Sequence, residues 1–278
     1  MKETDSLRAD VALVRRGLAP SRERAQALIA AGLAMQNGRK IARSSARISE
    51  ADRLEVTGCD LPYVGRGGFK LARALEAFGI APAGQVCMDI GASTGGFTDV
   101  LLRAGARLVY AIDVGSNQLA PELRADPRVV SMEHTNARAL RPEMFEPLPS
   151  LAVMDVSFIS IRLILPSALA VLGAHGRMVA LIKPQFEAGP SRLGKKGVVT
   201  DPAVHAEVLR EAVAFAPSLG WHIRAIEPSP ILGGSGNLEF LADFVPDGAS
   251  QEPPVGEDRI REVVRAAHRL RRGAGAGR

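Results

Sequence analysis

One segment of this chain runs through three patterns in succession that specify a strand, a tight turn and a helix. The apolar run Val86–Ile90 leads directly into Gly91-Ala92-Ser93-Thr94-Gly95-Gly96-Phe97-Thr98, and the amphipathic stretch Asp99–Ala104 follows at once. Glycines let backbone N–H groups approach a ligand, and the next helix begins with the positive end of its dipole. In doubly wound α/β folds, such a turn after the first strand holds a nucleotide-like cofactor. The segment therefore predicts an α/β fold with a cofactor at this turn.

The spacing of the turn differs from that of a dinucleotide-binding fingerprint. The fingerprint reads G-x-G-x-x-G, whereas this chain has Gly91-x-Ser93-x-Gly95-Gly96, with Asp89 just before it. An acid at the turn suits a cationic ligand better than a pyrophosphate, and S-adenosyl-L-methionine carries an ammonium and a sulfonium. We therefore predict cofactor contacts from Asp89, Gly91, Ser93, Gly95, Gly96, Phe97 and Thr98. The alternative is that the glycines only let a helix pack closely against a sheet.

Predicted strands and helices alternate after residue 69. The helical patterns include Ile161–Leu172 and Pro202–Ala216. The predicted strands are Val86–Ile90, Leu108–Ile112, Arg128–Met132, Leu151–Met154, Arg177–Ile182, His222–Ile226 and Glu239–Phe244. This alternation predicts an α/β domain with a seven-stranded, mostly parallel sheet. Because only a loop separates the last two strands, we expect them to form an antiparallel hairpin at one edge.

The N-terminal residues predict a small, separate α+β unit. A helix over Arg8–Arg16 precedes a second helix, for which Ser21 is the expected N-cap, and Asn37-Gly38 is typical of a hairpin turn. The pattern Gly17-Leu18-Ala19-x-Ser21-Arg22-x-x-Ala25-x-x-Leu28-Ile29-x-x-Gly32-x-x-x-x-Asn37-Gly38 resembles the S4 RNA-binding domain.

The S4 resemblance implies contacts between basic side chains and RNA phosphates. The predicted RNA-binding residues are Arg8, Arg15, Arg16, Arg22, Arg24, Arg39, Lys40, Arg43 and, closer to the α/β domain, Arg66. The alternative is a small domain whose basic surface is only solvated.

Local composition sets the predicted domain boundaries. A Gly- and Pro-containing stretch separates the two units, and the chain after residue 247 is rich in Pro and Gly before a basic helix over Arg259–Arg272. We therefore predict an S4-like domain over residues 1–60, a linker over 61–68, an α/β domain over 69–247 and a basic, partly disordered tail over 248–278.

Charge and composition narrow the expected partners and compartment. A net charge of +5 favours a polyanionic partner, and an aromatic content of 4% argues against binding through many stacked bases. The two cysteines fit no metal or redox spacing, and no apolar run reaches the roughly 18 residues of a membrane span. We therefore expect a reduced, cytoplasmic protein without a metal and without stable membrane association.

Two strand ends beyond the Gly-rich turn predict further cofactor contacts. Asp113 ends the second predicted strand, where an acid can accept hydrogen bonds from the ribose hydroxyls of an adenosyl group. Asn136-Ala137 follows the third strand and is placed to flank an adenine. The alternatives are a helix cap for Asp113 and an ordinary loop for Asn136-Ala137.

Four charged residues lie next to predicted strand ends or at the entry to the domain. Asp155 follows the fourth strand, Lys183 the fifth, Glu239 opens the last strand, and Lys70 lies on the helix that enters the domain. Because the carboxyl ends of parallel strands share one rim of a sheet, we expect these side chains to converge near the cofactor turn. Asp155 is then also a cofactor contact. The alternative is that each of these residues, taken singly, only forms an ion pair at the protein surface, which is the more common role of a lone Lys, Asp or Glu.

With their local sequences, these residues resemble the Lys-Asp-Lys-Glu set of the FtsJ/RrmJ-like ribose methyltransferases. The segments Arg66-Gly67-Gly68-Phe69-Lys70-Leu71, Asp89–Thr98, Asp155–Ser160 and Lys183-Pro184-Gln185-Phe186 resemble the TlyA family, in which an S4 domain precedes the methyltransferase domain. The resemblance implies a Rossmann-like, S-adenosylmethionine-dependent methyltransferase domain. It also implies 2′-O-methylation of cytidine in ribosomal RNA, with the RNA or the ribosomal subunits as partner. Members of this family have also been labelled haemolysins.

The residue types fit that chemistry. A ribose 2′-hydroxyl becomes a good nucleophile only as its proton is removed, and a neutral amine can act as the general base. Lys183 is the candidate base, with Asp155 holding it, while Lys70 and Glu239 fix the hydroxyl and balance the charge. The sequence leaves open whether Lys183 instead only orients the oxygen.

Three other functions remain open from the sequence. The chain is alternatively an inactive RNA-binding factor in ribosome assembly, a haemolysin-like membrane-active protein, or a base methyltransferase. The intact set of four charged residues argues against an inactive RNA-binding factor. The lack of a convincing apolar segment argues against a membrane-active protein. The loop that begins Asp155-Val156-Ser157-Phe158 differs from the Asn/Asp-Pro-Pro-aromatic loop of many base methyltransferases.

Overall fold

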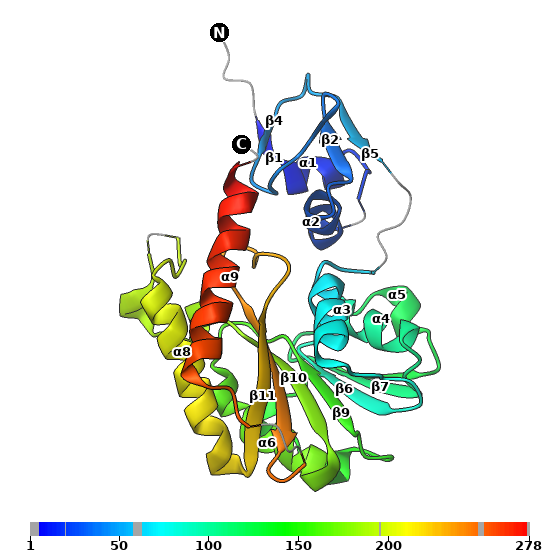
Figure 1. The fold of residues 1–278 in the computed structure, drawn as a ribbon. Helices are drawn as coiled ribbons and strands as arrows, with labels where there is room; N and C mark the ends of the chain where they lie inside the picture. Colours follow the sequence, from blue (N-terminus) through cyan, green and yellow to red (C-terminus); the bar gives the residue numbers. More distant parts are fainter. Residues whose placement is uncertain (1–5, 20, 58–62, 195, 250–252, 277–278) are drawn as a thin grey trace.

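The computed structural model describes residues 6–19, 21–57, 63–194, 196–249 and 253–276. A small N-terminal unit lies above one end of a larger α/β domain (Figure 1). The N-terminal unit contains β1 (Leu7–Arg8), α1 (Ala9–Arg15), α2 (Arg22–Ala30), β2 (Ala34–Gln36), β3 (Arg39–Lys40), β4 (Arg47–Ile48) and β5 (Leu54–Val56). The predicted α+β composition of this unit is therefore confirmed.

The N-terminal unit has its own apolar core and one buried ion-pair network. Leu13 of α1 and Ile29 of α2 pack together with strand residues such as Ile48. The side chain of Ser21 accepts a hydrogen bond from the backbone N–H of Arg24, which confirms the predicted N-cap. Asp10 is fully buried, and its carboxylate accepts hydrogen bonds from three side chains on α2 and the segment before α1, namely Arg8, Arg22 and Gln26.

The larger domain has the predicted fold class. Its elements are α3 (Gly67–Phe78), β6 (Val86–Ile90), α4 (Gly96–Arg103), β7 (Leu108–Ile112), α5 (Pro121–Arg124), β8 (Val129–Met132), β9 (Leu151–Met154), α6 (Leu165–Leu172), β10 (Arg177–Ile182), α7 (Pro184–Glu187), α8 (Pro202–Phe215), β11 (Trp221–Pro228), β12 (Phe240–Pro246) and α9 (Glu257–Ala276). In the part of the chain that the structure describes, seven strands form one sheet in the order β11-β12-β10-β9-β6-β7-β8. Strand β12 is antiparallel to both of its neighbours, which confirms the predicted edge hairpin, and the other pairings are parallel.

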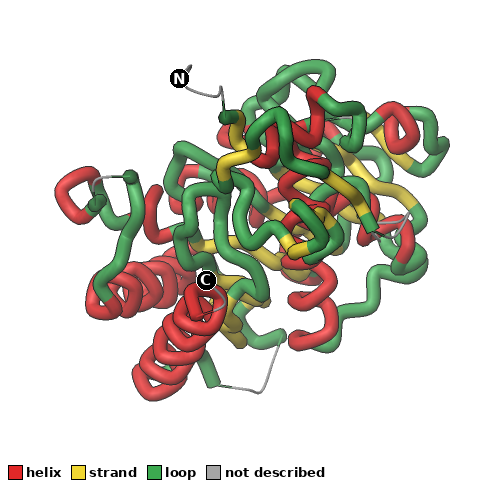
Figure 2. Tube along the Cα trace, turned by 90° about the horizontal axis from the view of Figure 1, so that it is seen from above, coloured by secondary structure: helices red, strands yellow, loops and turns green. Residues whose placement is uncertain are grey.

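Alternating side chains of the strands build a core on each face of the sheet. In β6, Met88 and Ile90 belong to the core that includes residues of α6, α8 and α9, whereas Cys87 belongs to the core with α3 and α4. Figures 1 and 2 show the two groups of helices on opposite sides of the sheet. Both faces are thus covered, as a mostly parallel sheet requires.

Helix α9 is part of the sheet domain, which corrects the predicted separate tail. Its residues Ile260, Val263, Val264 and Ala267 are each at most 4% exposed and belong to the core that covers β11. The spacing of these residues is that of one helical face. The many arginines between them lie on the other face, and they concealed this apolar face in the sequence. The helix extends to Ala276, beyond the predicted Arg272.

The predicted linker over residues 61–68 overlaps the sheet domain at its C-terminal end. Helix α3 already begins at Gly67, and Tyr63 and Val64 pack against the core of the sheet domain. Residues 61–62 of the predicted linker lie outside the described residues, as do residues 1–5, 20, 58–60, 195, 250–252 and 277–278 of the other predicted segments.

Candidate active site

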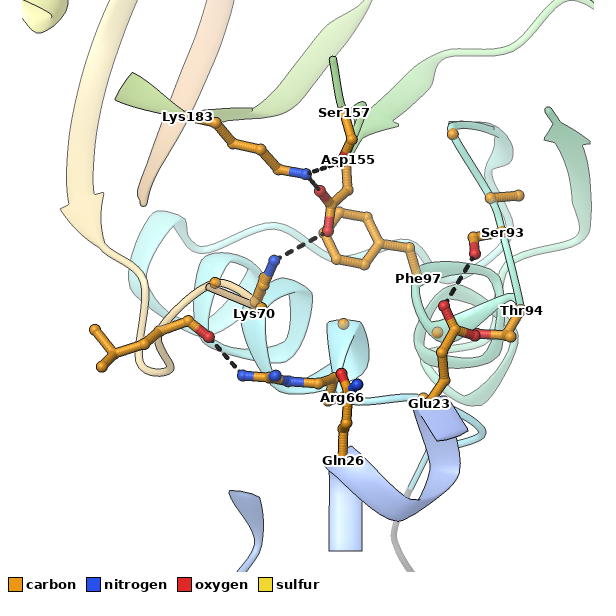
Figure 3. Close-up of a pocket in the computed structure, with 18 residues that line it drawn as sticks. Glu23, Gln26, Arg66, Lys70, Ser93, Thr94, Phe97, Asp155, Ser157 and Lys183 are labelled. Atoms are coloured by element: carbon orange, nitrogen blue, oxygen red, sulfur yellow. Dashed lines mark hydrogen bonds and ion pairs between the residues drawn. The ribbon is translucent and has the colours of Figure 1, made fainter. Parts of the chain in front are cut away.

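Four charged side chains from four separate segments meet at the carboxyl-end rim of the sheet, and Figure 3 shows Lys70, Asp155 and Lys183 among them. Lys183 Nζ lies 2.5 Å from Asp155 Oδ1, and Lys70 Nζ lies 3.2 Å from Asp155 Oδ2 and 2.7 Å from Glu239 Oε2. The two lysine amines and the two carboxyl groups therefore alternate in a single row. The predicted convergence of these residues is confirmed, because the strands β9, β10 and β12 bring their ends together.

Burial and pairing set the charge of this row. Lys70, Lys183 and Glu239 are each at most 7% exposed. Burial lowers the pKa of Lys70, but Asp155 and Glu239 outweigh it and hold this pKa above its ordinary value. Burial likewise raises the pKa of Asp155, but Lys70 and Lys183 outweigh it and hold this pKa below its ordinary value. Asp155 is thus a carboxylate at neutral pH, and Lys70 is a poor proton acceptor.

Ser157 is a member of the site for which the sequence analysis assigned no role. Its Oγ accepts a hydrogen bond of 2.9 Å from Lys183 Nζ, so Asp155 and Ser157 both hold this amine. The next residue, Phe158, has a positive φ of 64° and is 91% exposed. The centroid of its ring lies 5.1 Å from that of Phe186. The signal for Ser157 was its place in the strand-end loop, but the sequence did not show which side chains of that loop point inward.

The Gly-rich turn passes directly beneath this row. Gly91 has a φ of +83°, and a Cβ at this residue would lie 2.6 Å from the carbonyl oxygen of Asp155. Gly95 has a φ of +95°, and a Cβ there would lie 2.2 Å from Leu123 Cδ1. The two glycines act differently, because Gly91 brings the turn close to the charged row whereas Gly95 permits close helix packing. Gly95 thus fits the alternative of close helix packing, whereas a ligand contact at Gly91 stays a prediction.

Two adjoining cavities open on either side of the turn. The smaller, of about 230 Å³, is lined by charged side chains including Arg66, Lys70 and Lys183. The larger, of about 580 Å³, is lined by a mixture of apolar and polar groups. Gly91, Ser93, Asp155 and Ser157 line both cavities, so a single elongated ligand can reach from one to the other.

The larger cavity fits an adenosyl group. Its wall contains the apolar residues Ile112, Val114 and Ile159, which offer contacts to a base. The carboxylate of Asp113 also lies on this wall, and it accepts hydrogen bonds from the N–H groups of Ser93 at 2.8 Å and Gly115 at 2.7 Å. These bonds fix the carboxylate at the cavity while leaving lone pairs for ribose hydroxyls.

The structure divides the predicted cofactor residues into two groups. The residues that line a cavity are Gly91, Ser93, Gly96, Phe97, Asp113, Asn136, Ala137 and Asp155. Those that line neither are Asp89, Gly95 and Thr98. Asp89 is fully buried behind the turn, where it accepts a 2.7 Å hydrogen bond from the Thr98 hydroxyl, and burial raises its pKa to about 7. The direct contact of Asp89 with a cationic ligand stays a prediction, and in the structure its carboxyl group lies behind the turn.

Several predicted RNA-binding arginines hold the protein itself together. Arg8 and Arg22 pair with buried Asp10, and Arg16 donates hydrogen bonds to backbone carbonyls in the loop over residues 49–52. Arg24 donates a hydrogen bond to the Tyr63 carbonyl, and Arg66 donates one of 2.5 Å to the Leu232 carbonyl. The predicted residues that are exposed and for which no such bond is seen within the described chain are Arg15, Arg39, Lys40 and Arg43.

Two side chains of the N-terminal unit line the smaller cavity, and sequence reasoning did not find them. Glu23 and Gln26 of α2 lie on its wall, opposite the Gly-rich turn. Glu23 belongs to no sequence motif and is the acid in the first turn of α2. Contact across the boundary between two units has no sequence signal of its own, because it depends on how the units pack.

The described residues include no group of three or more His, Cys, Asp and Glu side chains arranged to hold a metal ion. No helix among them is both long and apolar enough to cross a membrane.

Comparison with known proteins agrees with the geometry of the site. The FtsJ-like methyltransferase family model matches residues 63–244. The "16S/23S rRNA (cytidine-2'-O)-methyltransferase TlyA" of Mycobacterium tuberculosis is 47% identical over 84% of this chain and 88% of that protein. "Hemolysin A" of Brachyspira hyodysenteriae is 43% identical over 86% of this chain and 100% of that protein. A solved structure from Streptococcus thermophilus is 42% identical, with a TM-score of 0.77 and coverage of 99% of this chain and 100% of that one. The chain therefore belongs to the FtsJ-like methyltransferase family, within the group that includes TlyA.

Proposed function

We propose that this protein methylates the ribose 2′-hydroxyl of a cytidine in ribosomal RNA, with S-adenosyl-L-methionine as the methyl donor. The observation that carries the proposal is the alternating row Lys183–Asp155–Lys70–Glu239 beside the Gly-rich turn. The name of the Mycobacterium tuberculosis relative supports the choice of cytidine and of ribosomal RNA.

The row supplies a proton acceptor held by fixed charges. Lys183 is the candidate base or orienting group, because Asp155 and Ser157 direct its Nζ toward the cavity rim. Lys70 stays protonated through its two carboxylate partners, so its role is to fix the reacting oxygen electrostatically. Glu239 compensates the charge of Lys70 in an environment that excludes water.

Different parts of the methyl donor occupy the two cavities in this proposal. We assign the adenosyl group to the larger cavity, with Asp113 at its ribose and Asn136-Ala137 at its base, and the amino-acid end to the smaller cavity. The bound donor supplies a methyl group already activated on a sulfonium. The residues of the chain then need only orient the hydroxyl and accept its proton.

The N-terminal unit is the candidate RNA-docking domain, of the S4 type. Its exposed basic residues, Arg15, Arg39, Lys40 and Arg43, give it a surface for phosphates. Residues 1–60 and the α/β domain from α3 to α9 are then the two functional domains. The smaller cavity is formed between them.

Transfer of a labelled methyl group tests this proposal. Purified small and large ribosomal subunits without prior modification are incubated with labelled S-adenosylmethionine, and the RNA is digested to nucleosides. Label in 2′-O-methylcytidine supports the proposal, and the labelled subunit identifies the substrate. Label on a base contradicts it. Bound cofactor without any transfer favours an inactive RNA-binding assembly factor instead.

A further inference from the structure

One carboxylate on the wall of the smaller cavity comes from the N-terminal unit. Glu23 lies in the first turn of α2, and its Oε1 is 3.5 Å from the hydroxyl oxygen of Ser93 in the Gly-rich turn (Figure 3). Gln26, one turn later, lines the same cavity and also donates a hydrogen bond to buried Asp10. The wall opposite the turn is thus connected to the core of the N-terminal unit.

Contacts on both sides of the cavity fix α2 against the sheet domain. The Arg24 guanidinium donates a hydrogen bond to the Tyr63 carbonyl, and the ring of Tyr63 meets Phe69 edge-on at 5.6 Å. Phe69, on α3, packs against the core of the N-terminal unit. Gly68 leaves space for this arrangement, because a Cβ there would lie 2.4 Å from the Tyr63 ring. These contacts hold helix α2, and with it the backbone of Glu23, next to the cavity.

The other acids near the turn are either enclosed in the protein or already paired. Asp89 is enclosed behind the turn, and Asp113 accepts two backbone N–H groups in the larger cavity. Asp155 lies between two lysines, and Glu239 is paired with Lys70. Glu23, which is exposed and contacts the Ser93 hydroxyl, is the acid of the smaller cavity that can receive a cation from solution.

We propose that Glu23 binds the α-ammonium of the methyl donor, so that the N-terminal unit completes the cofactor site. This inference rests on the proposed function, because it takes the amino-acid end of S-adenosylmethionine as the occupant of the smaller cavity. The guanidinium of Arg66 also lines this cavity, and it suits the carboxylate of the same zwitterion. The ammonium then needs an acid, which buried Asp89 does not provide.

The arrangement links RNA docking to cofactor binding. Because Glu23 lies two residues after the N-cap Ser21, any movement of α2 on RNA changes the distance between Glu23 and the turn. Thermodynamic linkage requires the reverse effect as well, so bound cofactor favours the orientation of the N-terminal unit seen here.

Two cofactor fragments test the inference by isothermal titration. S-adenosylhomocysteine keeps the α-ammonium, whereas 5′-methylthioadenosine lacks the whole amino-acid end. In the full-length protein, we expect Glu23→Gln to weaken S-adenosylhomocysteine binding about tenfold or more, because it removes a charged hydrogen-bond partner. Binding of 5′-methylthioadenosine should change less than about twofold. Glu50→Gln, the same change at an exposed position of the same unit, is the matched control and should affect neither ligand.

The outcomes separate this inference from the proposed function. Equal weakening of both ligands by Glu23→Gln would show a role in the shape of the pocket and would overturn the inference. Unchanged affinity for S-adenosylhomocysteine would also overturn it. If the unaltered protein bound neither ligand, the proposed cofactor itself would be wrong, and the inference would fail with it.

Discussion

The sheet domain and the N-terminal unit use their charged residues in opposite ways. In the sheet domain, the four charges of the row are packed against one another and are largely removed from water. In the N-terminal unit, Arg39, Lys40 and Arg43 lie on the surface. Buried pairs keep a fixed geometry, whereas exposed charges act over a distance and are screened by salt. One domain is therefore suited to chemistry on a single hydroxyl, and the other to attraction of a polyanion.

Removal of the buried amine is the strongest test of this contrast. We expect Lys183→Ala to lower methyl transfer about 10²- to 10⁴-fold, because a positioned proton acceptor contributes rates of that order. Ser157→Ala should lower the rate of methyl transfer less than Lys183→Ala, because Asp155 still holds the Lys183 amine. Single-turnover transfer measures the loss, and titration with S-adenosylhomocysteine serves as the control for folding and cofactor binding. Unaltered turnover in Lys183→Ala would remove this residue from the mechanism.

Helix α9 sharpens the comparison, because it joins a basic surface to the core of the sheet domain. Ile260 is 2% exposed, and Ile260→Ala should destabilise the protein by roughly 2–4 kcal/mol through the cavity it leaves. Leu270→Ala, at a residue of the same helix that is 47% exposed, should change stability by no more than about 0.5 kcal/mol. Denaturant titration measures both. Equal effects would mean that α9 is only a loosely attached tail.

Asp10 is the exception within the N-terminal unit, since its charge is buried. Burial raises the pKa of Asp10, but hydrogen bonds from Arg8, Gln26 and Arg22 outweigh it and lower the pKa from 3.8 to about 2. A depressed pKa stabilises the fold above pH 3.8, so this contribution is lost as the pH falls toward 2. The lowered pKa of Asp10 contributes about 2 kcal/mol to the free energy of unfolding at neutral pH.

Asp10→Asn should therefore lower the stability of the unit at neutral pH and remove this part of its acid dependence. Hydrogen exchange of the α1 and α2 amides between pH 2 and 6 follows the change. The exposed Glu50→Gln is the control. An identical acid profile in Asp10→Asn and the unaltered protein would contradict the assignment.

The smallest effect is expected for the exposed arginines. Arg39→Ala combined with Arg43→Ala should weaken RNA binding moderately and should reduce the slope of log affinity against log salt by about 2, roughly one unit for each lost phosphate contact. Catalysis at saturating RNA should be unaffected. Binding titrations at several salt concentrations measure the slope. An unchanged slope would exclude this face as the docking surface.

The sequence predicted those features that depend on neighbouring residues or on simple periodicity. The strands β6, β7, β9 and β10 have the predicted bounds, because each is a compact apolar run between turn residues. The convergence of Asp155, Lys183 and Glu239 followed from the rule that strand ends share one rim. Helix α9 was misjudged because its arginines dominated the composition of the segment, although the spacing of Ile260 and Val264 carried the helical period.

The sequence by itself determined the α/β fold, the Gly-rich turn and the identity of the row of charged residues. Only the tertiary structure decided that Asp89 lies behind the turn and that Arg22 donates a hydrogen bond to buried Asp10. It also decided that Glu23 lines the cavity from the other domain. The physical reason is that a motif gives only the residue types and their spacing along the chain. The burial of a side chain and its partners depend instead on the packing of segments that are distant in sequence.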